Sequence, residues 1–181
     1  MPPLLSITTC YAFLPLEEDE LKPLREELLR FGTVREMNGL VLLAPEGINS
    51  TVCGTADAIA EWKVRMRALK SDILFKDSCA EQPVFRRWSV KVKPELITFK
   101  QPGIIPGGKN KHLTPHAWKQ MMEREDVVLV DARNGYEVAI GKFRNALDPQ
   151  LKHFQDFPVA IRAVSIPKEK TVMLYCTGGI R

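Results

Sequence analysis

Apolar and polar residues in the first half of the chain follow two different periods, which predict an alternation of strands and helices. Residues 4–13 are rich in β-branched, aromatic and apolar side chains, a composition typical of a strand. Over residues 17–31 the apolar side chains recur at helical spacing, and Gly32 is placed to end that helix as a C-cap. The expected helical face consists of Leu21, Leu24, Leu28 and Phe31.

The pattern then returns to the strand period before a second helix. Residues 33–44 predict a strand interrupted by a tight turn at Asn38 and Gly39, and residues 48–53 predict another strand. After Thr55 the helical period resumes, and residues 73–76 and 85–92 are again extended. The apolar face of this second helix consists of Ile59, Trp62, Met66 and Leu69. The β-α-β-β-α-β order predicts an α+β, ferredoxin-like domain over residues 1–93.

Residues 94–111 are rich in proline and glycine and predict a linker to a second domain, residues 112–181. The sequence predicts a helix that begins at Thr114 and runs to about residue 124. It predicts another helix over residues 151–164, although Pro158 is unfavourable in the interior of a helix. Two short apolar runs, residues 127–130 and 171–175, are typical of buried parallel strands. The second domain is therefore expected to be α/β. Ligands in such folds bind beyond the carboxyl ends of the strands, where Asp131 and Cys176 lie.

Composition narrows the functional classes. The chain has 181 residues with an apolar fraction of 45%, ordinary for a globular protein. It shows no apolar run long enough for a membrane span and no signal-peptide pattern, so we expect a cytoplasmic protein without membrane contact. Its four cysteines are far apart, and its histidines have no acid or cysteine at ligand spacing, so neither a disulfide framework nor a metal site is expected. No cofactor motif is present, and oligomeric state is left open.

Positive charge is concentrated in one segment. The net charge is +4, yet residues 84–112 alone carry seven Lys or Arg and a single acid. Within this segment Arg86, Arg87 and Lys91 surround Trp88, an arrangement that offers charge and stacking to single-stranded RNA. The alternative is an ordinary solvated strand and linker, with Trp88 as a core residue. Charge and spacing alone leave the two interpretations about equal.

Cys176 is the strongest chemical candidate in the chain. It follows a predicted strand directly and opens a loop that continues through Thr177, Gly178, Gly179, Ile180 and Arg181. Glycines allow successive N–H groups to point inward and form an anion-binding nest, which Arg181 can close with its charge. Such a loop favours a thiolate, a persulfide sulfur or an oxyanion. The alternative, an inert apolar cysteine, suits Cys10, Cys53 and Cys79 instead.

Asp131 and Arg133 form a second candidate pair, after the first predicted strand of the α/β domain. They either make a structural ion pair that supports the loop or contact substrate directly. An acid at a strand end most often caps nearby backbone groups, so we favour the supporting role.

Several motifs resemble a known family. The spacing from Cys176 to Arg181 is similar to the active-site loop of rhodanese sulfurtransferases. More specifically, four segments together resemble the tRNA uridine hydroxylase family over essentially the whole chain: residues 44–49 (APEGIN), 85–91 (FRRWSVK), 131–137 (DARNGYE) and 175–181 (YCTGGIR). This resemblance implies an acylphosphatase-like first domain and a rhodanese-like second domain. It also implies hydroxylation of the wobble uridine of tRNA to 5-hydroxyuridine, with molecular oxygen as co-substrate, the anticodon loop as partner and Cys176 as catalytic residue.

The chain departs from the family pattern at two points. Asn145 stands where rhodaneses usually have glycine, and residues 111–181 are too few for a complete rhodanese domain. We therefore expect the second domain to be partial and the 181-residue chain by itself to have little or no activity. Two alternatives stay open: a sulfurtransferase that passes sulfur from a Cys176 persulfide to an acceptor, and a non-catalytic RNA-binding module.

Overall fold

The computed structural model describes residues 4–101, 103–104 and 112–181, which fall into two compact units. The first unit extends to Leu96, and the second begins at Ile97. The first residues of the expected linker therefore belong to the two units themselves. Its residues 102 and 105–111 lie outside the described part of the chain.

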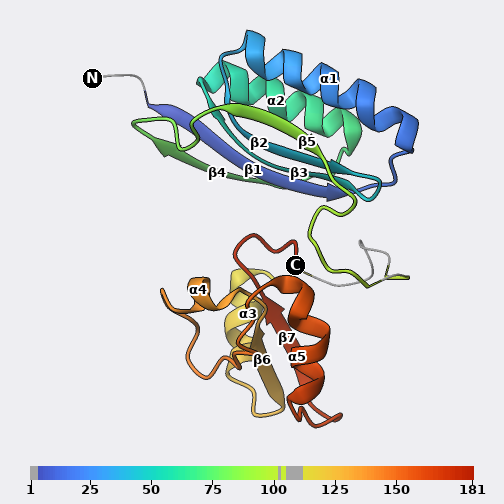
Figure 1. Ribbon diagram of the computed structural model, residues 1–181. Helices are drawn as coiled ribbons and strands as arrows, with labels where there is room; N and C mark the ends of the chain where they lie inside the picture. The colour runs from blue at the N-terminus through green and yellow to red at the C-terminus, as the bar shows by residue number, and fades with distance from the viewer. Residues whose placement is uncertain (1–3, 102, 105–111) are drawn as a thin grey trace. The chain divides into compact units, whose positions relative to one another are not determined.

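A five-stranded sheet forms the first unit, and both of its long helices lie on one face of the sheet (Figure 1). The strands are β1 (Leu5–Phe13), β2 (Asn38–Ala44), β3 (Gly47–Gly54), β4 (Phe75–Ala80) and β5 (Trp88–Val92), in the order β4-β1-β3-β2-β5. The helices are α1 (Glu18–Val34) and α2 (Ala56–Leu69). The predicted ferredoxin-like order is confirmed, and β5 extends the sheet by pairing parallel to β2.

The core of this unit lies between the helices and the sheet. Leu28 and Phe31 of α1 and Trp62 of α2 are buried in it, as their helical spacing predicted. They pack against alternate residues of the central strands, namely Val41, Leu43, Ile48 and Val52, none of which is exposed. Thr55 caps α2, its hydroxyl accepting the N–H of Ala58 at 3.2 Å. The two-residue period of the strands thus sends one set of side chains to the helices and the other to the opposite face.

The end of α1 differs from the prediction in an informative way. The helix continues past Gly32 to Val34, and Glu36 adopts the left-handed conformation, with φ +49°. The N–H of Met37 donates to the carbonyl of Gly32 at 2.8 Å, which closes a Schellman-type cap. Gly32 has another role, because a Cβ there would lie 2.1 Å from Cε2 of Trp88. The Asn38 and Gly39 pair, expected to form a turn, instead begins β2.

The second unit combines two parallel strands with short helices. They are β6 (Val127–Asp131) and β7 (Thr171–Tyr175), α3 (Pro115–Met122), α4 (Gly135–Val138), the 3-10 helix η1 (Phe154–Asp156) and α5 (Phe157–Ala163). Strands and parallel direction agree with the prediction. The helix expected over residues 151–164 begins later, because Leu151 bridges to Asn134 and Pro158 occupies the first turn of α5.

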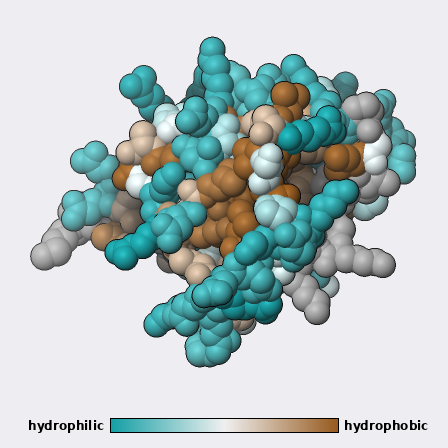
Figure 2. Space-filling view, turned by 90° about the horizontal axis from the view of Figure 1, so that it is seen from below, coloured by the Kyte–Doolittle hydropathy of each residue, from teal (hydrophilic) through white to brown (hydrophobic). Residues whose placement is uncertain are grey.

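One expectation about burial in the second unit is wrong. Both β6 and β7 were predicted to be buried, and Val130 of β6 is fully buried. In β7, however, Val172 and Leu174 are 45% and 48% exposed, and Met173 between them is buried. In Figure 2, where hydrophobic residues are brown, some of them are visible at the surface. Among the described residues, no helix has the length and hydropathy needed to cross a membrane.

Candidate functional site

Cys176 lies directly after β7, at the start of the predicted anion-binding loop. Its side chain is half-buried, and Sγ accepts the backbone N–H of Gly179 at 2.9 Å. Gly179 has φ +80°, a conformation that glycine adopts without strain. A backbone amide aimed at sulfur stabilises negative charge on it. This contact is the part of the predicted nest that the structure shows.

Arg181 does not close the loop over the sulfur in the way its spacing suggested. Its Nη1 donates to Oε2 of Glu137 at 2.7 Å and to the carbonyl of Ala132 at 3.5 Å. The hydroxyl of Thr177 donates to Oε1 of the same carboxylate. Glu137 therefore holds the loop near both ends, and the guanidinium of Arg181 is paired with a carboxylate.

Glu137 is the residue of this site that sequence reasoning did not select. Asn134, before α4, donates its backbone N–H to Oε2 of Glu137 at 3.0 Å, so the carboxylate is fixed by its own helix start as well as by the loop. Burial raises the pKa of Glu137, but hydrogen bonds from Arg181 and Thr177 outweigh burial and lower it overall. A signal was present in the sequence, since an Asn three residues before a Glu is typical of a helix start.

Asp131 and Arg133 form the expected ion pair. Asp131 is fully buried, and its Oδ2 lies 2.7 Å from Nη2 of Arg133 and 2.5 Å from the hydroxyl of Tyr175. Its Oδ1 accepts the backbone N–H and Nε of Arg133. Burial raises the pKa of Asp131, and these hydrogen bonds reverse that effect and lower it. Burial and the bond to Asp131 raise the pKa of Tyr175. These contacts hold the carboxyl ends of β6 and β7 together.

The strand register brings Asp131 and Cys176 to the same end of the two-stranded sheet. Asp131 pairs with Tyr175, the residue before Cys176, so the carboxyl ends of β6 and β7 are level. An open hollow of about 430 Å³ lies in the same unit and has Arg181 and Asn134 in its wall. Its remaining wall residues are Ile97, Thr98, His153, Phe154 and Gln155. A small ligand could enter it and reach the guanidinium end of the loop.

Cys10 and Cys53 fit the inert, apolar interpretation given to them, whereas Cys79 does not, because it is exposed. All four cysteines are free thiols; Cys10 and Cys53 are buried, and Cys79 is exposed on β4. Burial raises the pKa of Cys10, which keeps that thiol protonated. Within the described ranges, no group of three His, Cys, Asp or Glu residues could hold a metal ion.

The candidate RNA-binding residues differ in whether they are exposed or packed against the core of the first unit. Arg86, Arg87 and Lys91 are exposed. Trp88 instead faces the helices: its ring lies 5.7 Å from that of Trp62, and Nε1 donates to the carbonyl of Leu28 at 3.3 Å. Trp88 therefore acts as a core residue, the alternative that the sequence left open, and its indole is not presented to a base.

Comparison with known proteins gives matches over most of the chain. Residues 5–96 match the family described as UPF0176 acylphosphatase like domain. A protein named tRNA uridine(34) hydroxylase from Bdellovibrio bacteriovorus is 40% identical over 185 residues, which cover 97% of this chain and 51% of the relative. Proteins of the same name from Prochlorococcus marinus (strain MIT 9303) and Deinococcus radiodurans are each 36% identical. The chain covers 60% and 59% of these two, so it spans between half and three fifths of the relatives' length.

Solved structures give a weaker match. The structure titled "BlrB - a BLUF protein, dark state structure" is 20% identical with a TM-score of 0.40, and the match covers 51% of this chain and 73% of that one.

Proposed function

Because the chain belongs to the tRNA uridine(34) hydroxylase family, with a UPF0176 acylphosphatase like domain over residues 5–96, we propose that it takes part in hydroxylating the wobble uridine of tRNA to 5-hydroxyuridine. The substrate is the anticodon loop, molecular oxygen is the co-substrate that the resemblance implies, and Cys176 is the catalytic residue. The second unit is proposed to be rhodanese-like.

One observation carries the assignment of Cys176. In the described part of this unit, its sulfur combines partial exposure, a backbone N–H at 2.9 Å and a place at the carboxyl end of a parallel strand. The neighbouring carboxylate of Asp131 accepts hydrogen bonds from Arg133 and Tyr175, and we assign it the role of holding the strand ends together. The hollow beside Arg181 and Asn134 offers space for a base that has left the stack, which enzymes acting on a base ring require.

A hybrid protein tests this role. Residues 1–181 replace the matching part of the Bdellovibrio bacteriovorus relative, and the hybrid is expressed in a strain that lacks its own enzyme of this kind. Mass spectrometry of the tRNA is expected to detect 5-hydroxyuridine with the unmodified hybrid. Cys176→Ala is expected to abolish it, whereas Cys79→Ala, which removes an exposed cysteine of the first unit, should not. Undiminished 5-hydroxyuridine with Cys176→Ala would exclude the cysteine from the chemistry.

Sulfur transfer is the second candidate, and the contact between Gly179 and Cys176 favours it to the same degree. An N–H that stabilises a thiolate also stabilises the terminal sulfur of a persulfide. Transfer of sulfur from thiosulfate to cyanide by the same hybrid, lost in Cys176→Ala, would support this activity. The two assays run together separate hydroxylation from sulfur transfer. RNA binding without turnover in either assay would instead indicate a non-catalytic module.

A further inference from the structure

The face of the first sheet that α1 and α2 do not cover has a distinctive composition. Strand pairing places Tyr11, Asn49, Leu42 and Lys91 in one row across β1, β3, β2 and β5. The adjacent row runs through Lys76, Thr9, Thr51, Leu40 and Ser89. The hydroxyls of Thr9 and Thr51 lie 3.0 Å apart, in agreement with a shared face.

The strand residues of the helix-free face include positive charges and no carboxylate. Among the strand residues that alternate onto the helix-free face, no Asp or Glu occurs, whereas Lys76 and Lys91 lie on its two edge strands and are exposed. The acid of β4, Asp77, points to the helix side, where it bonds Lys63 and Thr8. The helix-free face is therefore complementary to a polyanion.

Aromatic rings lie between these lysines. Tyr11 and Phe13 of β1 form an edge-on pair with centroids 6.0 Å apart, and Nζ of Lys76 lies 6.0 Å from the Tyr11 ring. Both aromatic side chains are half-buried. An aromatic ring on a central strand, flanked by an amide, hydroxyls and lysines, is the combination with which sheets hold unpaired bases: the ring stacks, the amide and hydroxyls bond base edges, and the lysines contact phosphates.

We propose that this helix-free face is a platform for single-stranded RNA, with Tyr11 as the stacking residue and Lys76 and Lys91 as phosphate contacts. The proposal deepens the function proposed above, because an anticodon loop presents unpaired bases. It also moves the RNA contact away from Trp88, which faces the core, and keeps Lys91.

Binding of fluorescein-labelled oligouridine to the full chain tests the platform by fluorescence anisotropy at several salt concentrations. Tyr11→Leu is expected to weaken binding roughly 5- to 150-fold, the loss typical of one stacked base. Tyr11→Phe keeps the ring and should bind like the wild type. Lys91→Gln should reduce the slope of log affinity against log salt by about 0.7, the value for one phosphate contact on a single strand. The duplex of the same strand with oligoadenine should bind more weakly.

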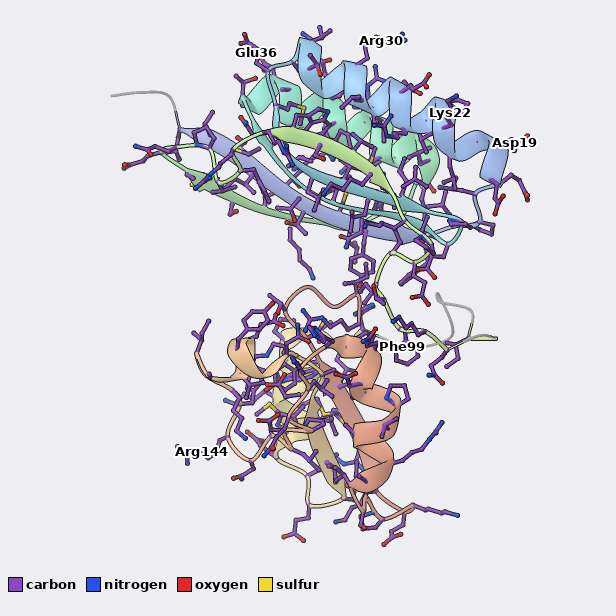
Figure 3. All side chains as sticks on the ribbon, viewed as in Figure 1. Asp19, Lys22, Arg30, Glu36, Phe99 and Arg144 are labelled. Atoms are coloured by element: carbon purple, nitrogen blue, oxygen red, sulfur yellow. The ribbon has the colours of Figure 1, made fainter. Side chains whose placement is uncertain are left out.

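Matched controls lie on the other side of the unit. Lys22 and Arg30 are exposed on α1 and point away from the sheet (Figure 3), so Lys22→Gln and Arg30→Gln should leave the salt slope unchanged. Circular dichroism verifies that each variant is folded. If Tyr11→Leu does not fold, Lys91→Gln still decides, because an unchanged salt slope would contradict the platform.

Three results would overturn the platform. The first is that the wild type does not bind oligouridine at low salt, and the second is that both Tyr11→Leu and Lys91→Gln bind like the wild type. The third is that Lys22→Gln reduces the salt slope as much as Lys91→Gln does. The second result is expected if the face contacts protein instead. Cys176→Ala separates this proposal from the catalytic one, because it should bind RNA normally and yet abolish 5-hydroxyuridine in the hybrid.

Discussion

At the scale of single residues, the second unit is organised around two carboxylates whose charges are matched by neighbours. Asp131 bonds Arg133 and Tyr175, and Glu137 bonds Arg181 and Thr177. The first carboxylate links the ends of β6 and β7, and the second links α4 to the loop of Cys176. Neither acid contacts the sulfur. Both act by fixing the backbone that presents it.

Removal of the buried charge at Asp131 should be costly. Asp131→Asn leaves the guanidinium of Arg133 without its counter-ion, and breaking such a buried pair typically costs about 3 kcal/mol or more. We expect faster hydrogen exchange in β6, measured by mass spectrometry. Asp148→Asn, a change of an acid in a loop of the same unit, is the control. Equal protection of β6 in both variants would contradict this role.

The pH dependence of stability follows from the same two acids. Their pKa values are lowered by folding, so they contribute stability that is fully present above the unfolded pKa, about 4, and is lost as pH falls through the folded pKa. The free energy of unfolding of the second unit should therefore decrease as the pH falls below about 4. Exchange of β6 amides across this range measures it, after correction for the intrinsic rate. Asp131→Asn should show a smaller decrease than the wild type.

Glu137 is expected to matter for the loop more than for the fold. Glu137→Gln weakens three hydrogen bonds to a charged group, from Arg181, Thr177 and the backbone N–H of Asn134, each worth about 1.5–3 kcal/mol in similar settings. In the hybrid protein we expect less 5-hydroxyuridine and altered reactivity of Cys176 toward iodoacetamide. Glu123→Gln, an exposed acid after α3, serves as control. Wild-type reactivity and product in Glu137→Gln would show that the loop keeps its form without this carboxylate.

At the scale of elements, the packing of α1 on β5 depends on a glycine. Gly32 lies inside the helix, where glycine is normally unfavourable, because the indole of Trp88 occupies the space of a side chain. Because Gly32 has no side chain, the Trp88 indole fits between α1 and the sheet while β5 pairs with β2.

Gly32→Ala should therefore destabilise the first unit although alanine favours helices. The added methyl would meet Trp88, and overpacking of this kind costs about 1–3 kcal/mol. Urea unfolding monitored by circular dichroism measures the change. In a Trp88→Leu background the same substitution should be neutral or stabilising. A destabilisation of equal size in both backgrounds would show that the indole is not the cause.

Elements with clear periodicity could be predicted from the sequence, and those set by long-range contacts could not. The faces of α1 and α2 were found because Leu28 and Trp62 sit at helical spacing. The end of α1 was missed because Glu36, a residue without turn preference, takes the left-handed position. Trp88 remained ambiguous because a tryptophan beside arginines suits both a core and an RNA surface. The role of Glu137 required knowing that α4 lies against the loop.

At the scale of the whole chain, the edge strands of the two sheets differ in the polarity of their side chains. The five-stranded sheet has β4, rich in polar side chains, at one edge and a lysine on its other edge strand. In the described part of the second unit, β7 pairs with β6 alone and exposes Val172 and Leu174. An apolar edge strand of this kind favours association.

We expect the chain to self-associate as its concentration rises, through β7. Val172→Lys should shift sedimentation toward the monomer, because charge on an edge strand opposes pairing with another chain. Val64→Lys, a change at an exposed valine of α2, is the matched control. Association that persists in Val172→Lys and disappears in Val64→Lys would place the contact elsewhere.

The bond between Glu137 and Arg181 has a consequence for selectivity. A guanidinium already neutralised by a carboxylate leaves the loop without surplus positive charge. A negatively charged phosphodiester of the RNA backbone entering there would meet the Glu137 carboxylate and should be repelled, whereas an uncharged uracil ring would not. The loop would thereby discriminate between the phosphate and the base of a nucleotide: it would exclude the RNA backbone and accept the base.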